Sequence, residues 1–290
     1  MKLRAHVVFL LLLAAVPSWG QQAVTPSHKD VSYGPHKAQA VDVYLPKSDK
    51  PTPAMIQIHG GGWRAGSKLH VPSFLKRAVA EGWLAVVSVE YRFTNVAIHP
   101  AQTNDCLRAV QFVRSKAKEW NIDPTRIGAT GGSAGGHLTM FVALHDDLAD
   151  SDSDDPVARQ SSRVQCAVPF AGPSDWSLLS TIKHDHPAYR QLIGYEPGTP
   201  AGDMKEGRKK KVSPITYVSS DDPPMMIVHG DGDVIVPHAH AEVMFKGLKA
   251  AGVEVDLVTI KGGKHNVSGA GQPEAVNKAV PFIKKHLKVK

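Results

Sequence analysis

Two kinds of apolar pattern alternate along most of the chain. Short runs that are apolar almost throughout predict strands of a parallel sheet, because helices cover such strands on both faces. The run at 40–45 instead alternates apolar and polar residues, as expected of an early strand with one wet face. Strands are expected at residues 40–45, 55–59, 84–89, 127–130, 164–170, 225–229 and 253–260.

Longer stretches between these runs carry apolar residues at helical spacing. Cys106, Ala109, Val110 and Val113 show this spacing within one of them. Helices are expected at residues 71–80, 101–120, 134–145, 239–251 and 274–286. Strands and helices in turn predict an α/β fold, a mostly parallel twisted sheet flanked by helices.

Two segments interrupt the alternation. Residues 146–155 hold six Asp, but they lack the glycine and the spacing of an EF-hand, so a solvated loop is expected rather than a calcium site. Residues 176–212 are rich in Pro, Gly, Lys and aromatic residues and have no clear period. They fall between two strands on the side where active-site loops gather, which predicts a small lid or substrate-shaping insertion.

The N-terminus has the pattern of a secretion signal over residues 1–20. A basic start precedes ten apolar residues, 7–16, and small residues follow at a cleavable position. Ten residues are too few for a stable transmembrane helix, and no Cys marks a lipid anchor. The expectation is a secreted or periplasmic protein without stable membrane insertion after signal removal. Residues 21–39 then form an N-terminal extension before a catalytic domain at 40–290.

The distribution of charge and the cysteine content limit the kinds of molecule that the protein is expected to bind. The net charge of +7 comes largely from lysines at 205–211 and 284–290, which do not interleave with aromatic residues as in a single-strand binder. No nucleic-acid partner is expected, and nothing specifies an oligomeric state. Cys106 and Cys166 lie in apolar segments and are expected to be small buried residues, with a disulfide the less favoured alternative. No zinc-type spacing occurs, so neither a metal nor a cofactor is expected.

The segment 131–135 reads Gly-Gly-Ser-Ala-Gly and fits G-x-S-x-G. An apolar run precedes it and a helical stretch follows, which is the context of a sharp strand-to-helix turn that exposes a nucleophilic serine. Ser133 is the predicted nucleophile, with the alternative that it is an idle serine in a glycine-rich turn.

The segment 59–63, His-Gly-Gly-Gly-Trp, follows a predicted strand. Successive glycines allow backbone amides to turn towards a substrate oxygen, so Gly61, Gly62 and Ala134 are the predicted oxyanion donors. A phosphate-binding loop is the weaker alternative, because Ser67 and Lys68 stand in the wrong order for one.

A serine nucleophile needs a base, and the chain holds fifteen histidines. His265 follows the last predicted strand and precedes the last helix, which places it at the catalytic edge of the sheet. His238 and His240 are alternatives. His137 is expected to pack, and His229 to tie down a loop.

The acid that orients the imidazole is expected just after a strand. Asp233 in His-Gly-Asp-Gly-Asp is the first choice and Asp231 the alternate. The order Ser133, Asp233, His265 is the order expected for this kind of turn and fold.

These motifs resemble those of α/β-hydrolases of the esterase/lipase superfamily. The similarity is closest to the acetyl-xylan and feruloyl esterase-like branch, which is akin to hormone-sensitive-lipase-type esterases, and it extends from about residue 41 to about 287. The stretches that carry it are 59–63, 89–93, 100–102 with Asp105, 121–124, 131–136, 172–175, 223–224, 229–233 with 236–237, and 263–265.

The resemblance implies an α/β-hydrolase fold with a small insertion near the active site. It implies Ser133, Asp233 and His265 as a triad, and Gly61, Gly62 and Ala134 as oxyanion donors. It also implies that Trp63 walls the substrate pocket, with ordinary core packing as the alternative.

The expected activity is hydrolysis of carboxylic esters through an acyl-enzyme. Short-chain acyl esters or acetyl and feruloyl esters, as small molecules or on polysaccharides, fit the resemblance. The large N-terminal helical cap of related enzymes has no counterpart in the sequence, which favours an open site. Alternatives are an amide, formamide or peptide hydrolase with the same triad, and a catalytically silent hydrolase fold that binds carbohydrate.

Overall fold

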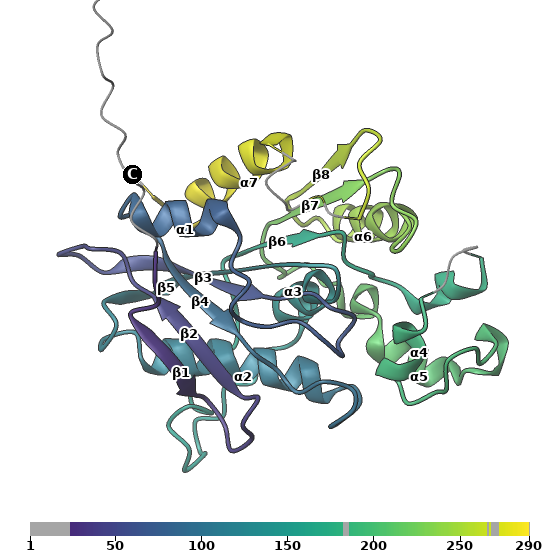
Figure 1. The fold of residues 1–290 in the computed structure, drawn as a ribbon, viewed down its shortest axis with the longest axis horizontal. Helices are drawn as coiled ribbons and strands as arrows, with labels where there is room; N and C mark the ends of the chain where they lie inside the picture. The colour runs from purple at the N-terminus through teal and green to yellow at the C-terminus, as the bar shows by residue number, and fades with distance from the viewer. Residues whose placement is uncertain (1–23, 182–185, 266, 268–272, 290) are drawn as a thin grey trace, which may run out of the picture.

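The protein is built around one eight-stranded sheet (Figure 1). The structure, a computed structural model, describes residues 24–181, 186–265, 267 and 273–289. The predicted secretion signal at 1–20 lies outside the described residues. The strand order is β1-β2-β4-β3-β5-β6-β7-β8.

Pairing is antiparallel between β1 and β2 and between β2 and β4, and parallel from β4 across to β8. The mostly parallel sheet predicted from the apolar runs is thereby confirmed. The strands are β1 His28–Ser32, β2 Ala40–Tyr44, β3 Thr52–Ile58, β4 Ala85–Val89, β5 Ile122–Gly132, β6 Cys166–Phe170, β7 Met225–Gly230 and β8 Val255–Ile260.

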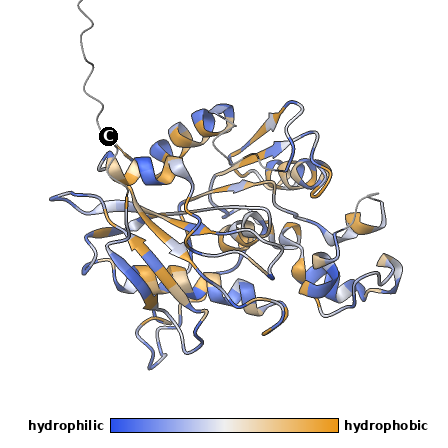
Figure 2. Ribbon diagram, viewed as in Figure 1, coloured by the Kyte–Doolittle hydropathy of each residue, from blue (hydrophilic) through white to orange (hydrophobic). Residues whose placement is uncertain are grey.

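Helices cover both faces of the sheet (Figure 1). Strand β3 shows the division, because Met55 packs in the cluster formed with α1 and α7, whereas Ile56 packs in the cluster formed with α2, α3 and α6. The apolar strands between two amphipathic layers are visible in Figure 2. The longer helices are α1 Ser73–Ala80, α2 Ala101–Ser115, α3 Ala134–Leu144, α6 Ala239–Ala250 and α7 Pro273–His286.

Strand β1 was not predicted from the sequence. It is an edge strand whose residues are mostly exposed, so burial imposes no apolar alternation on it. Helix α2 ends at Ser115 rather than at residue 120, because the chain tightens into turns before reversing into β5. In these turns the Trp120 amide donates to the Lys116 carbonyl, and Asn121 adopts a left-handed φ of 52°.

The described residues of the expected insertion, 176–181 and 186–212, form short helices. They project beside the carboxyl ends of the central strands (Figure 1), and Trp176, Tyr189 and Val212 bury their side chains in the α2/α3 cluster. These helices are η1 Trp176–Ser180, α4 Ala188–Leu192, η2 Ala201–Asp203 and α5 Glu206–Val212, followed by η3 Pro214–Tyr217.

Other expectations from composition concern single side chains. Cys106 and Cys166 are buried, free thiols, as their apolar surroundings predict.

Within the described part of the chain, no group of three or more His, Cys, Asp or Glu side chains is arranged to hold a metal ion. The Asp-rich segment instead makes local contacts, such as those of Asp147 with the Ala149 and Ser162 amides. Over the same residues, no helix is long and apolar enough to cross a bilayer.

The packing of β3 predicts a large difference between two isoleucine truncations. Ile56 is fully buried in the centre of the sheet, whereas Ile98 is 43% exposed. Ile56→Ala is expected to lower the free energy of unfolding by about 2–5 kcal/mol because it leaves a cavity in close-packed surroundings. Ile98→Ala, the matched control, should cost clearly less. Urea unfolding of both variants measures the difference, and equal costs would contradict the packing described.

Candidate active site

Ser133 stands in the turn between β5 and α3. Its backbone angles are φ 58° and ψ −122°, a strained conformation for a residue with a side chain. The surroundings hold it there, since the Ser133 amide donates to the Phe170 carbonyl at 2.8 Å and the His137 amide donates to the Ser133 carbonyl at 3.0 Å. This is the geometry of a nucleophile elbow, in which the hydroxyl projects beyond the sheet.

The two glycines of G-x-S-x-G allow the turn to approach β3. A Cβ on Gly131 or on Gly135 would collide with the carbonyl oxygen of Ile58. The strained serine is therefore supported by a backbone-to-backbone contact that no larger residue permits.

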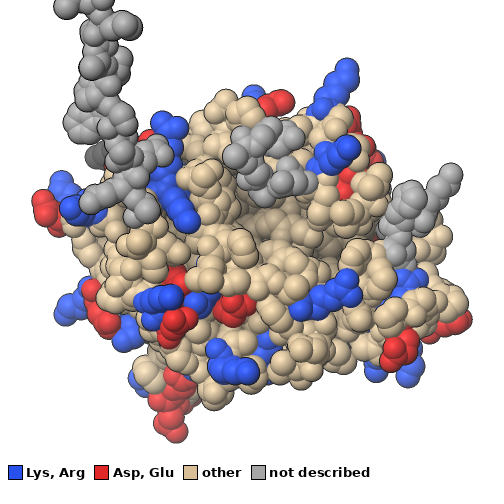
Figure 3. Space-filling model, viewed as in Figure 1, with Lys and Arg blue, Asp and Glu red and all other residues tan. Residues whose placement is uncertain are grey.

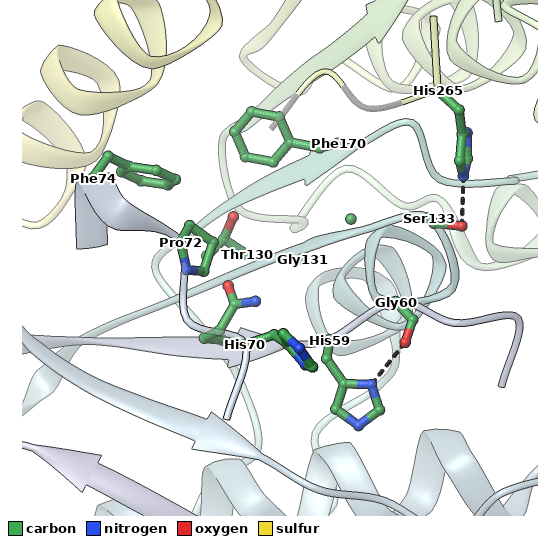
Figure 4. Close-up of a pocket in the computed structure, with 12 residues that line it drawn as sticks. His59, Gly60, His70, Pro72, Phe74, Thr130, Gly131, Ser133, Phe170 and His265 are labelled. Atoms are coloured by element: carbon green, nitrogen blue, oxygen red, sulfur yellow. Dashed lines mark hydrogen bonds between the residues drawn. The ribbon is translucent and has the colours of Figure 1, made fainter. Parts of the chain in front are cut away.

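His265 lies within hydrogen-bond distance of both Ser133 and Asp233. His265 Nε2 is 2.8 Å from Ser133 Oγ, and His265 Nδ1 is 2.7 Å from Asp233 Oδ2. An ionised carboxylate only accepts, so Nδ1 carries the proton and Nε2 is free to accept from the serine hydroxyl. The folding chain thus brings together three side chains that are far apart in sequence (Figure 4 shows the contact between Ser133 and His265).

The Asp233 carboxylate is buried and well satisfied. Its Oδ1 accepts from the amides of Ile235 at 2.9 Å and Val236 at 3.0 Å, and His229 Nε2 lies 3.3 Å from its Oδ2. Burial alone would raise the pKa of Asp233, but hydrogen bonds from His229, His265 and the Val236 amide outweigh it and hold this pKa well below its usual range. The carboxylate therefore stays ionised and acts as a fixed acceptor for the imidazole.

The alternate acid and the alternate bases lie elsewhere. Asp231 is exposed and accepts from the Gly262 amide, as a turn former does. The His238 ring contacts the Thr259 hydroxyl at 2.9 Å. His240 is buried, where its Nδ1 accepts from the Ser174 amide at 3.2 Å, and burial lowers its pKa to about 3.

His137 packs under the site, as expected. It is fully buried in α3, accepts from the Trp63 indole at its Nδ1 at 3.2 Å, and donates from Nε2 to the Val212 carbonyl at 2.8 Å. Burial lowers its pKa to about 3. The ring is therefore neutral, and its two hydrogen bonds connect the glycine loop after β3 with the end of the insertion.

The glycine loop 60–65 faces the serine from the end of β3. Gly61 and Gly62 have φ values of 114° and 61°, which turn the backbone in a direction that side-chain-bearing residues resist. Both glycines border the same cavity as Ser133 and His265. Ala134 also borders it, and its amide, at the first position of α3, has no acceptor within the helix.

One residue that anchors this loop was not assigned a role from the sequence. Glu90 lies just after β4, and its Oε1 is 2.8 Å from Nε2 of His59, the residue that precedes the glycines. The other ring nitrogen of His59 lies 2.7 Å from the Gly60 carbonyl. The sequence signals were the charged residue directly after an apolar strand and its place in the stretch 89–93, which carries part of the family resemblance.

Two cavities meet at Ser133 and His265, and Figure 3 shows the hollow at this place. The first, called the Trp63 cavity, has a volume of about 400 Å³ and is bordered by Gly61, Gly62, Trp63, Ala134 and Tyr189 among others. The second, called the Gln57 cavity, has a volume of about 330 Å³ and is bordered by Gln57, His70, Phe74, Thr130 and Phe170 among others.

Trp63 both borders a cavity at the site and packs in the core, which were the two alternatives given from the sequence. Its side chain borders the Trp63 cavity, yet the residue is only 2% exposed. Its ring centroid lies 5.8 Å from that of Trp176 and 6.0 Å from that of Tyr189, both in the insertion. The aromatic packing connects the insertion to the loop that carries Gly61 and Gly62.

Comparison with known sequences places this site in a family. The BD-FAE family matches residues 41–248. Two relatives from Mycobacterium tuberculosis are a probable carboxylic ester hydrolase, LipM, 34% identical over 72% of this chain and 48% of its own length, and the esterase LipQ, 30% identical over 77% of this chain and 53% of its own. The chain thus spans about half the length of these curated relatives.

Solved structures give a similar result over whole chains. A truncated form of a carbohydrate esterase from gut microbiota is 28% identical with a TM-score of 0.79, covering 92% of this chain and 99% of that one. An acetyl ester-xyloside bifunctional hydrolase from Caldicellulosiruptor lactoaceticus is 27% identical with a TM-score of 0.69, covering 86% and 85%. The chain has the α/β-hydrolase fold and belongs to the BD-FAE family.

Proposed function

We propose that this protein is a serine esterase, which hydrolyses carboxylic esters through an acyl-enzyme formed on Ser133. The observation that carries the proposal is the hydrogen-bonded series from Ser133 through His265 to Asp233, beside a cavity bordered by Gly61, Gly62 and Ala134. The names of the relatives, which include carboxylic ester hydrolases and esterases, support the same reaction class.

The geometry supports a two-step reaction. Ser133 Oγ attacks the ester carbonyl carbon while its proton passes to His265 Nε2, and the negative charge on the carbonyl oxygen is stabilised by the amides of Gly61, Gly62 and Ala134. The bond to the alcohol oxygen then breaks, and the same proton passes from Nε2 to the departing alcohol. Water attacks the acyl-enzyme in the reverse sense, which releases the acid and restores the serine. Asp233 stabilises the imidazolium formed in each step.

As substrates we propose short-chain or aromatic acyl esters, such as acetyl or feruloyl esters, carried on small molecules or polysaccharides. The described residues before α1 contain no helical cap over the site, which supports access for bulky substrates. Trp63 and the insertion 176–212 would shape the pocket, since Ala188 and Tyr189 border the Trp63 cavity with Trp63. Amide or peptide hydrolysis would use the same side chains, with a nitrogen leaving group in place of the alcohol oxygen.

Replacing the nucleophile tests the proposed mechanism. Ser133→Ala is expected to lower kcat for 4-nitrophenyl acetate about 10³-fold or more, because loss of a triad member removes the acyl-enzyme route. A fluorophosphonate probe should label the wild-type protein and not the variant. Ser151→Ala, which changes an exposed serine in the Asp-rich loop, serves as the control and should keep both properties. A wild-type protein that neither turns over esters nor takes the label would support the silent-fold alternative.

The lowered pKa of Asp233 makes its stabilising effect dependent on pH. A carboxyl group whose folded-state pKa is depressed stabilises the fold fully above its unfolded pKa of about 3.9, and the effect is lost as pH falls through the folded pKa. The difference in unfolding free energy between wild type and Asp233→Asn should therefore be largest near neutral pH and narrow below about pH 4. Urea unfolding at pH 7 and pH 3 measures this, and a constant difference would count against an ionised, hydrogen-bonded Asp233.

We further propose that residues 1–20 direct secretion, so that the mature protein is extracellular or periplasmic. The basic start and the apolar run at 7–16 support this. Expression of the full chain should yield a secreted product whose N-terminus, determined by mass spectrometry, lies near residue 21. A full-length product that stays inside the cell would contradict the proposal.

A further inference from the structure

Four polar side chains lie in register on one face of the sheet, where Asp42 on β2 pairs with Ser88 on β4. Gln57 on β3 pairs with Ser88 on β4 and with Thr130 on β5. Two residues earlier, the same face presents Met55, which packs in the apolar cluster with α1 and α7. Gln57, Ser88 and Thr130 lie near the carboxyl ends of their strands, next to the elbow.

Three of these four side chains have partners within the protein, and Asp42 Oδ1 lies 2.9 Å from Lys68 Nζ. The Ser88 hydroxyl donates to the Lys68 carbonyl and the Thr130 hydroxyl donates to the Val168 carbonyl, each at 2.7 Å. Their hydrogen-bonding needs are met by local backbone, as is usual for buried hydroxyl groups.

Gln57 differs from both hydroxyl side chains. It is 4% exposed, and its Oε1 has no hydrogen-bond partner among the described residues. Its Nε2 has only a long contact of 3.5 Å with the Ile58 carbonyl. A buried amide in this condition destabilises the fold unless a solvent or ligand molecule in the neighbouring cavity completes its hydrogen bonds.

The amide borders the Gln57 cavity, which opens onto the reacting groups. Ser133 and His265 lie at one end of this cavity and Phe74 at the other, with Phe170, Pro72 and Thr130 between them (Figure 4). The volume of about 330 Å³ lies in the range of small-molecule sites.

The lining selects for a neutral, hydroxyl-bearing ligand. None of the described residues that border the Gln57 cavity is Lys, Arg, Asp or Glu, and of its three histidines His59 and His265 are already hydrogen-bonded to the carboxylates of Glu90 and Asp233. A charged group entering the cavity would therefore lose hydration and gain at most the His70 ring as a partner. An amide both donates and accepts, which suits hydroxyl groups, whereas a purely apolar alcohol would leave Gln57 unpaired. The rings of Phe74 and Phe170 and the adjacent Pro72 provide apolar walls for carbon-bound hydrogens.

We propose that the Gln57 cavity holds the alcohol half of the substrate, a neutral sugar with free hydroxyl groups beside the acylated one. Gln57 is then the residue that selects this alcohol. The acyl half lies in the Trp63 cavity, which is bordered by the oxyanion amides and by aromatic side chains. This assignment rests on the proposed esterase function and specifies which cavity binds which half of the ester.

The test compares two substrates with the same acyl group. The first is a methyl xyloside carrying one acetyl ester and the second is 4-nitrophenyl acetate, which has no sugar hydroxyls. Gln57→Leu replaces the amide with a slightly smaller apolar side chain, so the ratio of kcat/KM for the sugar acetate to kcat/KM for the aryl acetate should fall about tenfold. Ser88→Ala removes a hydroxyl from the same face of the neighbouring strand, outside the cavity lining, and should leave the ratio within about twofold.

A second measurement needs no variant and so does not depend on how Gln57→Leu folds. Unacetylated methyl xyloside should inhibit wild-type hydrolysis of 4-nitrophenyl acetate competitively. A methyl glucuronide, which is anionic, and a methyl glucosaminide, which is cationic, should each inhibit at least about fivefold more weakly, because the described lining offers a charged group at most the His70 ring as a partner.

The outcomes separate this assignment from the proposed function. An unchanged ratio in Gln57→Leu, equal inhibition by charged and neutral sugars, or a wild-type protein that cleaves aryl acetates but no sugar acetate would each overturn the assignment and leave the esterase function standing. A wild-type protein that cleaves neither ester and takes no fluorophosphonate label would overturn the esterase function itself.

Discussion

The site depends on one constraint, the strained backbone of Ser133 between β5 and α3. A residue at φ 58° and ψ −122° is stable only where its neighbours prevent relaxation. Here the Phe170 carbonyl fixes its amide, and the glycines on either side let the turn rest against the end of β3. The same contact determines where the glycine loop that continues from β3 lies relative to the serine hydroxyl. The Ser133 hydroxyl and the backbone amides of the glycine loop are therefore positioned by one close approach of two central strands.

Much of this arrangement could be predicted because the relevant segments are constrained by burial or by backbone geometry. The central strands are covered on both faces and so read as apolar runs, and the elbow and the glycine loop need glycines at fixed positions. Strand β1 could not be predicted, because an exposed edge imposes no pattern on its side chains. The choice between Asp231 and Asp233 likewise depended on a local turn, in which the amides of Ile235 and Val236 hold one carboxylate in place.

The two cavities could not be predicted from the sequence pattern, for a different reason. Each is assembled from segments distant in sequence, and the Gln57 cavity joins the loop before α1 to the ends of β3, β5 and β6. One signal was nevertheless present. Gln57 is the polar residue in the run Met-Ile-Gln-Ile, which is otherwise apolar. A strand covered on both faces by helices does not ordinarily carry an amide at such a position. The contact of Glu90 with His59 could not be predicted from the sequence either, because a charged residue after a strand is common.

The two cavities are built on supports of different stiffness. Trp63 touches His137, Trp176 and Tyr189, so a change in the insertion would be transmitted through these rings to the loop that carries the proposed oxyanion donors. Gln57 projects from a central strand whose backbone is held on both sides by its neighbours, and exchanging its side chain leaves that ladder intact. Divergence among related enzymes would then be uneven: a new leaving group could be accommodated by single substitutions on the sheet, whereas a new acid would require the aromatic packing to be rebuilt together with the machinery that handles the developing charge.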